Sequence, residues 1–246
     1  MAAIGAGGLH ADFGSGRWHG EPIGIPYTVV GAAQPKARVS FDYASESDKG
    51  PYPIPRDVRI EAGGDRHALI VDRDACRLYE LYALRRSAPG WRAGSGAIWS
   101  LRSNALRPAG WTSADAAGLP ILPGLARYDE VAAGHVDHAL RFTVDRTRDA
   151  YVYPARHEAS SLSDPDLPPM GLRLRLRADF DTSGFPTQAR VLLEALKRYG
   201  MVVADNGSSW FVSGVPDPRW DDDDLHTLGR VRGSDFEVVD PAAIRP

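Results

Sequence analysis

The chain has 246 residues, of which 43% are hydrophobic, 25% charged and 9% aromatic, and its formal net charge is −3. This composition excludes disorder over the whole chain, and the small charge disfavours a nucleic-acid-binding protein. No apolar run reaches the roughly 18 residues that a membrane span requires. We therefore expect no nucleic-acid partner and no membrane span.

Glycine and proline contribute 25 and 19 residues, which favours many short strands joined by turns. The single cysteine excludes a disulfide within the chain. Residues 1–56 show little hydrophobic periodicity, and within them we predict short strands only at 24–30 and 37–41. The rest of this segment is expected to form an irregular N-terminal wrap around the domain.

A β-hairpin is predicted next in the chain, with arms at 67–71 and 78–82 and a polar turn between them. Both arms are apolar on both faces, as in strands that are covered on two sides. Further apolar runs of strand length follow at 97–99, 136–144, 151–153, 172–176, 201–204 and 210–212.

One longer helix is predicted over 186–199. Pro186 lies in its first turn, an apolar stripe recurs at helical spacing, and Gly200 ends it. Shorter helices are predicted over 126–133 and 220–228. Because strands outnumber helices, we predict a mainly β fold in a single domain over 1–246, a β-sandwich or jelly-roll-like core with a few packed helices.

The predicted strand 136–144 places His138 in an apolar stripe, where each ring nitrogen needs a partner. A structural histidine and a general acid or base both fit this position. A metal site with His135 and His157 is disfavoured, because His135 and His138 are an odd number of residues apart and point to opposite faces. No metal ion and no other cofactor is predicted.

Glu80 lies in the second arm of the hairpin, between Leu78 and Tyr82 on its own face. A carboxylate is costly to bury there unless it is paired or protonated. The position therefore suits either a catalytic acid with a raised pKa or a salt bridge with an arginine of a neighbouring strand.

Two acidic residues are predicted in loops that also carry tryptophan. Asp115 follows Trp111 in a glycine-bounded loop, and Asp205 precedes Trp210 after a buried strand. Two carboxylates beside two aromatic platforms suit glycoside hydrolysis. The alternative for 205–207 is a simple hairpin turn, since Asp-Asn-Gly is a strong turn sequence.

Residues 172–177 alternate leucine and arginine, which places three arginines on one strand face about 7 Å apart. This face is suited to an acidic polysaccharide or to acidic residues of adjacent strands. Tyr153, Arg156 and His157 add an aromatic and basic segment that we also consider for substrate binding.

Several segments resemble a family of secreted bacterial and fungal proteins that are chiefly uncharacterised and often occur near polysaccharide-degrading enzymes. The likeness extends from Leu9 to about Val239, and its most recognisable segments are 136–143, 153–157, 167–175 and 199–210. The resemblance implies a secreted, extracellular protein in a carbohydrate setting, and it implies no catalytic residue. The first eight residues lack the pattern of a signal peptide.

The resulting hypothesis is a carbohydrate-active enzyme that binds a polysaccharide or oligosaccharide, with a glycoside hydrolase favoured over a polysaccharide lyase. A non-catalytic sugar-binding module and a structural or adhesion protein of the cell envelope are the alternatives. The sequence does not indicate an oligomeric state. The candidate catalytic residues are His138, Asp115, Asp205 and Glu80, and the candidate substrate contacts are Trp111, Trp210, Arg156, Tyr153 and His157.

Overall fold

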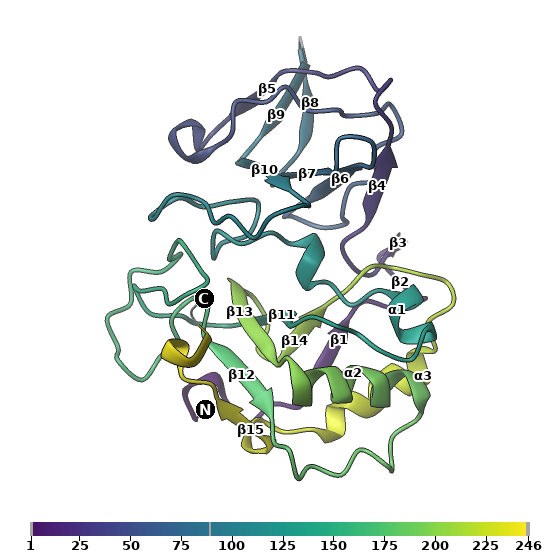
Figure 1. The fold of residues 1–246 in the computed structure, drawn as a ribbon, viewed down its shortest axis with the longest axis vertical. Helices are drawn as coiled ribbons and strands as arrows, with labels where there is room; N and C mark the ends of the chain where they lie inside the picture. Colours follow the sequence, from purple (N-terminus) through teal and green to yellow (C-terminus); the bar gives the residue numbers. More distant parts are fainter. Residues whose placement is uncertain (1, 89, 245–246) are drawn as a thin grey trace.

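The computed structural model describes residues 2–88 and 90–244. The mainly β prediction is confirmed: several sheets and few helices make up the chain. In Figure 1 the four-stranded and three-stranded sheets fill the upper part of the molecule, and a six-stranded sheet with its helices fills the lower part.

The six-stranded sheet has the strand order β1-β14-β11-β13-β12-β15 and mixes parallel with antiparallel pairs. Parallel pairing requires long connections, so strands far apart in the sequence become neighbours. Its strands are β1 (His10–Asp12), β11 (Leu140–Val144), β12 (Arg173–Leu176), β13 (Met201–Asn206), β14 (Phe211–Ser213) and β15 (Phe236–Val238).

Helix α2 (Thr187–Arg198) covers one face of this sheet. Its buried Leu192, Leu193 and Leu196 share a hydrophobic core with Phe142 and Val203 of the sheet. The helix stops before Gly200, whose φ of +74° is costly for other residues. The remaining helical elements are α1 (Tyr128–Ala132), α3 (Asp222–His226), and the 3₁₀ turns η1 (Ala2–Ile4), η2 (Ala44–Glu46), η3 (Leu122–Gly124), η4 (Thr227–Arg230), η5 (Gly233–Asp235) and η6 (Pro241–Ile244).

The remaining sheets are small, and the larger two of them build the upper part. The predicted hairpin forms the centre of a four-stranded sheet with the order β10-β7-β6-β4. Its strands are β4 (Tyr27–Val30), β6 (Ala68–Asp72), β7 (Arg77–Leu81) and β10 (Gly96–Ser100). A three-stranded sheet contains β5 (Val39–Phe41), β8 (Arg85–Ser87) and β9 (Gly90–Ala93), and a separate pair contains β2 (Arg17–Trp18) and β3 (Glu21–Pro22).

The central hairpin is covered on both faces, as its apolar arms predict. Ile70 and Tyr79 share a core with Val39 and Ala93 of the three-stranded sheet. On the opposite face Leu69 packs in a second core, with residues of the 114–125 segment. That segment crosses from the upper sheets to the six-stranded sheet (Figure 1).

Some local predictions were wrong. Strand β11 begins at Leu140, so His138 precedes the sheet and does not belong to an apolar strand face. Residues 151–153 form no strand, and Tyr151 makes only an isolated bridge with Met170. The N-terminal segment is more than a wrap, because β1 pairs in parallel with β14 and places Leu9 in the core.

Candidate active site

A row of polar side chains crosses the face of the six-stranded sheet opposite α2. Phe142 and Val203 point toward the helix, so Arg141, the residue before Phe142 in β11, points to the other face. Strand register places Ser213 of β14 beside Arg141, and Asp12 of β1 beside Ser213. The Arg141 Nη1 atom donates a hydrogen bond to Ser213 Oγ at 2.6 Å.

A β-bulge brings Asp205 to the same face. Phe142 pairs with Val203, but Thr143 pairs with Asp205, so Ala204 is an extra residue in β13. If β13 alternated strictly through Ala204, Asp205 would point toward the helix side; the bulge keeps it on the face of Arg141. The carbonyl of Ala204 accepts a hydrogen bond from the Ala117 N–H at 2.9 Å, which ties the bulge to the 113–120 loop.

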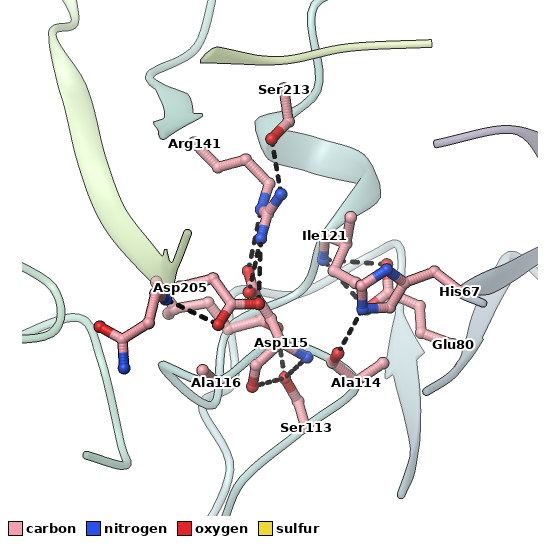
Figure 2. Close-up of polar contacts among 12 residues, drawn as sticks. His67, Glu80, Ser113, Ala114, Asp115, Ala116, Ile121, Arg141, Asp205 and Ser213 are labelled. Carbon is pink, nitrogen blue, oxygen red and sulfur yellow. Dashed lines mark hydrogen bonds and ion pairs between the residues drawn. The ribbon is translucent and has the colours of Figure 1, made fainter. Parts of the chain in front are cut away.

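That loop supplies the partner of Arg141. The Arg141 Nη2 and Nε atoms donate to Asp115 Oδ1 and Oδ2 at 2.9 and 3.2 Å, and the Asp115 side chain is 1% exposed (Figure 2). Asp205 Oδ2 lies 3.6 Å from the same Nη2 atom. Burial would lower the pKa of Arg141, but Asp115 and Asp205 outweigh it and raise that pKa. The guanidinium is therefore a fixed positive charge.

A buried histidine comes from the upper part of the molecule. The His67 Nδ1 atom lies 2.5 Å from Glu61 Oε2, and its Nε2 atom lies 3.0 Å from the Ala114 carbonyl oxygen. The Glu61 carboxylate and the Ala114 carbonyl oxygen both accept hydrogen bonds. Both ring nitrogens therefore carry hydrogen, and His67 is an imidazolium. Burial alone would lower the pKa of His67, but the contact with Glu61 outweighs it and raises that pKa.

Asp205 is an accessible and titratable member of this group. Its side chain is 25% exposed, whereas that of Asp115 is sealed. Burial and the charge of Asp115 raise the pKa of Asp205 to about 6, against the opposing effects of Arg141 and His67. A carboxyl with this pKa exists in both protonation states near neutral pH, which suits a general acid or base.

Two cavities adjoin at Asp205. One of about 410 Å³ is lined by Tyr43, Tyr82 and His157, and a smaller one of about 180 Å³ contains Asp12, Glu61 and His67. Both are also lined by Asp65, Asp205 and Asn206. The larger volume lies within the range of small-molecule sites, about 300–1,000 Å³.

The structure therefore brings two of the predicted catalytic residues together, Asp115 and Asp205. Glu80 is buried beside them in another role: its carboxylate accepts hydrogen bonds from the Ile121 and Leu122 N–H groups and from Trp99 Nε1. Burial raises the pKa of Glu80 to about 7, which was one of the two alternatives for this position; no arginine among the described residues forms the alternative salt bridge with it. With no exposed surface, it fixes the start of η3 and offers no contact to a substrate.

His138 lies apart from Asp205 and lines a different cavity, of about 630 Å³, together with Tyr153. Its Nε2 atom lies 3.2 Å from Glu130 Oε2 and its Nδ1 atom 2.9 Å from the Ala139 carbonyl oxygen.

The predicted substrate contacts differ in their surroundings: some line a cavity and others are buried in the interior. Trp210 is fully buried between Phe142 and Phe236, so it has no face for a sugar and its assignment as a platform is wrong. Arg107 lies over the Trp111 ring. The remaining candidates are Arg156, which donates from Nε to the Arg107 carbonyl at 2.9 Å, and His157, whose Nδ1 atom lies 2.8 Å from the Ala116 carbonyl oxygen.

The alternative reading of 205–207 as a hairpin turn is also wrong. Strand β14 does not pair with β13, because β11 lies between them in the sheet. Asp205 is the penultimate residue of β13. The chain after it passes the end of β11 to reach β14 on the other side of that strand.

Five further residues belong to the site without having been predicted from the sequence: Asp12, Glu61, His67, Arg141 and Ser213. His67 is the first residue of the predicted apolar arm at 67–71 and directly precedes β6, which was a usable signal for a buried histidine. The other residues carry no local signal, because sheet register and the bulge decide where they point.

Family models, curated proteins and solved structures give no match to this chain. Within residues 2–88 and 90–244, no three or more His, Cys, Asp or Glu side chains are grouped to hold a metal ion. Nor does that part of the chain contain a helix long and apolar enough to cross a membrane.

Proposed function

We propose that this chain is a secreted carbohydrate-active enzyme that hydrolyses glycosidic bonds in a polysaccharide, with Asp205 as its general acid. One observation carries the proposal: an accessible carboxyl with a pKa of about 6 lies where two polar cavities adjoin, above a buried Arg141–Asp115 pair. The extracellular setting rests on the sequence resemblance alone.

Glycoside hydrolysis needs a second carboxylate. Asp65 is our choice, because it is exposed and lines both cavities together with Asp205. Asp115 is sealed and Glu61 is bound to His67, so neither is free to contact a substrate.

In the proposed reaction, Asp205 donates its proton to the glycosidic oxygen as the bond to the anomeric carbon breaks. Asp65 accepts a proton from the water whose oxygen attacks that carbon, and proton exchange with solvent restores both groups. Tyr43 and Tyr82 provide aromatic faces in the larger cavity on which a sugar ring can stack.

The test is incubation with a panel of neutral and acidic polysaccharides, with reducing ends and the absorbance of unsaturated products read together. We expect reducing ends without unsaturation. Asp205→Asn is expected to lower kcat/KM by about 10²–10⁴-fold, and Asp65→Asn is expected to lower it as well. The matched control is Asp149→Asn, an exposed aspartate that lines neither cavity.

Unsaturated products would reject hydrolysis in favour of elimination, and binding without any product would favour a sugar-binding module. An Asp205→Asn variant with full activity would reject the assigned acid. Because a general acid must be protonated, the rate is expected to fall as the pH rises through about 6.

A further inference from the structure

The cavity of about 630 Å³ is lined by an arginine, Arg173, that forms no ion pair with any side chain of residues 2–88 and 90–244. It shares Asp115 with the 410 Å³ cavity but is otherwise lined by different residues, among them Arg173 of β12. Among the described residues that line it, Asp115 is the only one with a carboxylate, and Arg141 already neutralises that charge.

Arg173 is unusual among the arginines of this region. Its Nε atom is buried and lacks a hydrogen-bond partner, and no other Arg173 side-chain hydrogen bond or ion pair occurs within the described residues. Arg175, two residues along the same strand, instead forms an ion pair with Glu237. A buried donor is normally satisfied, so the Arg173 guanidinium is poised for an acceptor from outside the chain.

The rest of the lining fits a ring that carries a carboxylate. Tyr153 and His138 add polar groups, whereas Trp99, Leu101 and Leu106 form an apolar wall, with Leu101 and Leu106 partly exposed to solvent. The volume is within the range of small-molecule sites, about 300–1,000 Å³. An arginine beside an aromatic and aliphatic wall matches the carboxylate and the apolar ring face of an acidic sugar.

We propose that this cavity binds a uronic-acid unit of an acidic saccharide, with the Arg173 guanidinium holding its carboxylate. The choice of a saccharide rests on the carbohydrate setting of the proposed function. The expectation that the ligand is an anion rests on the Arg173 guanidinium, which is unpaired within the described part of the chain.

The experiment is isothermal titration calorimetry of the full chain with trisaccharides of galacturonate, mannuronate and glucuronate, and with a neutral trisaccharide. At least one uronate trisaccharide is expected to bind the wild type, and Arg173→Gln is expected to weaken that binding by about tenfold or more, the usual worth of a charge-assisted hydrogen bond. Arg175→Gln, on the same strand but exposed, is the matched control and should bind like the wild type.

Acetate and free galacturonate distinguish the two sources of a carboxylate. Tighter binding of the trisaccharide than of acetate supports a sugar site, whereas equal binding means a simple carboxylate site and overturns the saccharide. Equal affinity of Arg173→Gln and wild type, equal affinity for the neutral trisaccharide, or no binding of any uronate overturns the proposal.

If Arg173→Gln does not fold, the salt dependence of binding to the wild type still tests the proposal. Its uronate affinity should fall with rising NaCl concentration, while a neutral sugar should be insensitive, and a salt-independent uronate affinity would overturn the proposal. Arg173-dependent binding without Asp205-dependent hydrolysis would keep this inference and reject the proposed reaction. Asp205-dependent hydrolysis without Arg173-dependent binding would keep the proposed reaction and reject this inference.

Discussion

Arg141 holds Asp115 through two hydrogen bonds, of 2.9 and 3.2 Å, and both side chains are almost fully buried. The pair joins β11 of the six-stranded sheet to the 113–120 loop, which also packs against the upper sheets. A contact of this kind links the two halves of the site, so its loss should affect folding as well as chemistry.

Asp115→Ala should destabilise the fold by about 3–5 kcal/mol, because it leaves the Arg141 charge buried without its main partner. Urea unfolding at neutral pH measures the change. The double variant Asp115→Leu with Arg141→Met should recover part of the loss. A cost below about 1 kcal/mol, as found for exposed pairs, would contradict the buried geometry.

Asp205→Asn should stabilise the protein at alkaline pH. The folded pKa of about 6 lies above the ordinary value of 3.8, so folding favours the protonated carboxyl. Its stability contribution is complete below pH 3.8 and is lost as the pH rises through about 6. We expect the variant to be more stable by about 1–3 kcal/mol above pH 7 and equal to the wild type near pH 4, from urea unfolding at both pH values. A difference independent of pH would contradict the assigned titration.

His67 should be doubly protonated in the folded protein at neutral pH. Its folded pKa is raised, so its stability contribution is complete below the ordinary value of 6.5 and is lost as the pH rises through the higher folded value. Nitrogen NMR of the imidazole should show two protonated ring nitrogens at neutral pH, and one unprotonated nitrogen there would refute the assignment.

Glu61→Gln should lower the pKa of His67 and destabilise the fold by about 1–3 kcal/mol, since the buried imidazolium loses its carboxylate partner. Urea unfolding at mildly acidic pH, where the imidazolium is present in the wild type, is the measurement. Glu21→Gln, on the exposed surface, should change neither property. Equal stability of Glu61→Gln and wild type would mean that the contact contributes nothing.

Glu80→Leu should cost about 2–5 kcal/mol of stability, because it leaves the buried N–H groups of Ile121 and Leu122 and the Trp99 indole without an acceptor. Glu80→Gln keeps one acceptor oxygen and should cost less. Thermal and urea unfolding of both variants compare them. A larger loss of stability for Glu80→Gln than for Glu80→Leu would show that the hydrogen bonds of the carboxyl group do not fix η3.

Much of the scaffold was predictable from local patterns. The apolar arms around 67–82 predicted a hairpin covered on both sides, and α2 was predicted from its apolar stripe and from Gly200. The position of Glu80 between apolar neighbours predicted its burial, but it left a raised pKa and a salt bridge as alternatives, and the structure shows the first.

The site itself depended on contacts between distant segments. Asp115 and Asp205 were singled out from the sequence, but their relation to Arg141, and the presence of His67, were not. Trp210 also depended on distant segments. Its polar sequence neighbours predicted an exposed side chain, whereas the fold buries it between Phe142 and Phe236.

By itself, the sequence determined the mainly β class and the hairpin and helix that build the two parts, because these depend on periodicity and turn residues within short windows. Only the tertiary structure decided the site. Parallel pairing of β1 with β14 and the extra residue Ala204 in β13 set which side chains share one sheet face. Sheet register joins residues far apart in the chain, and one bulged residue reverses the face of every later side chain relative to strict alternation along the strand.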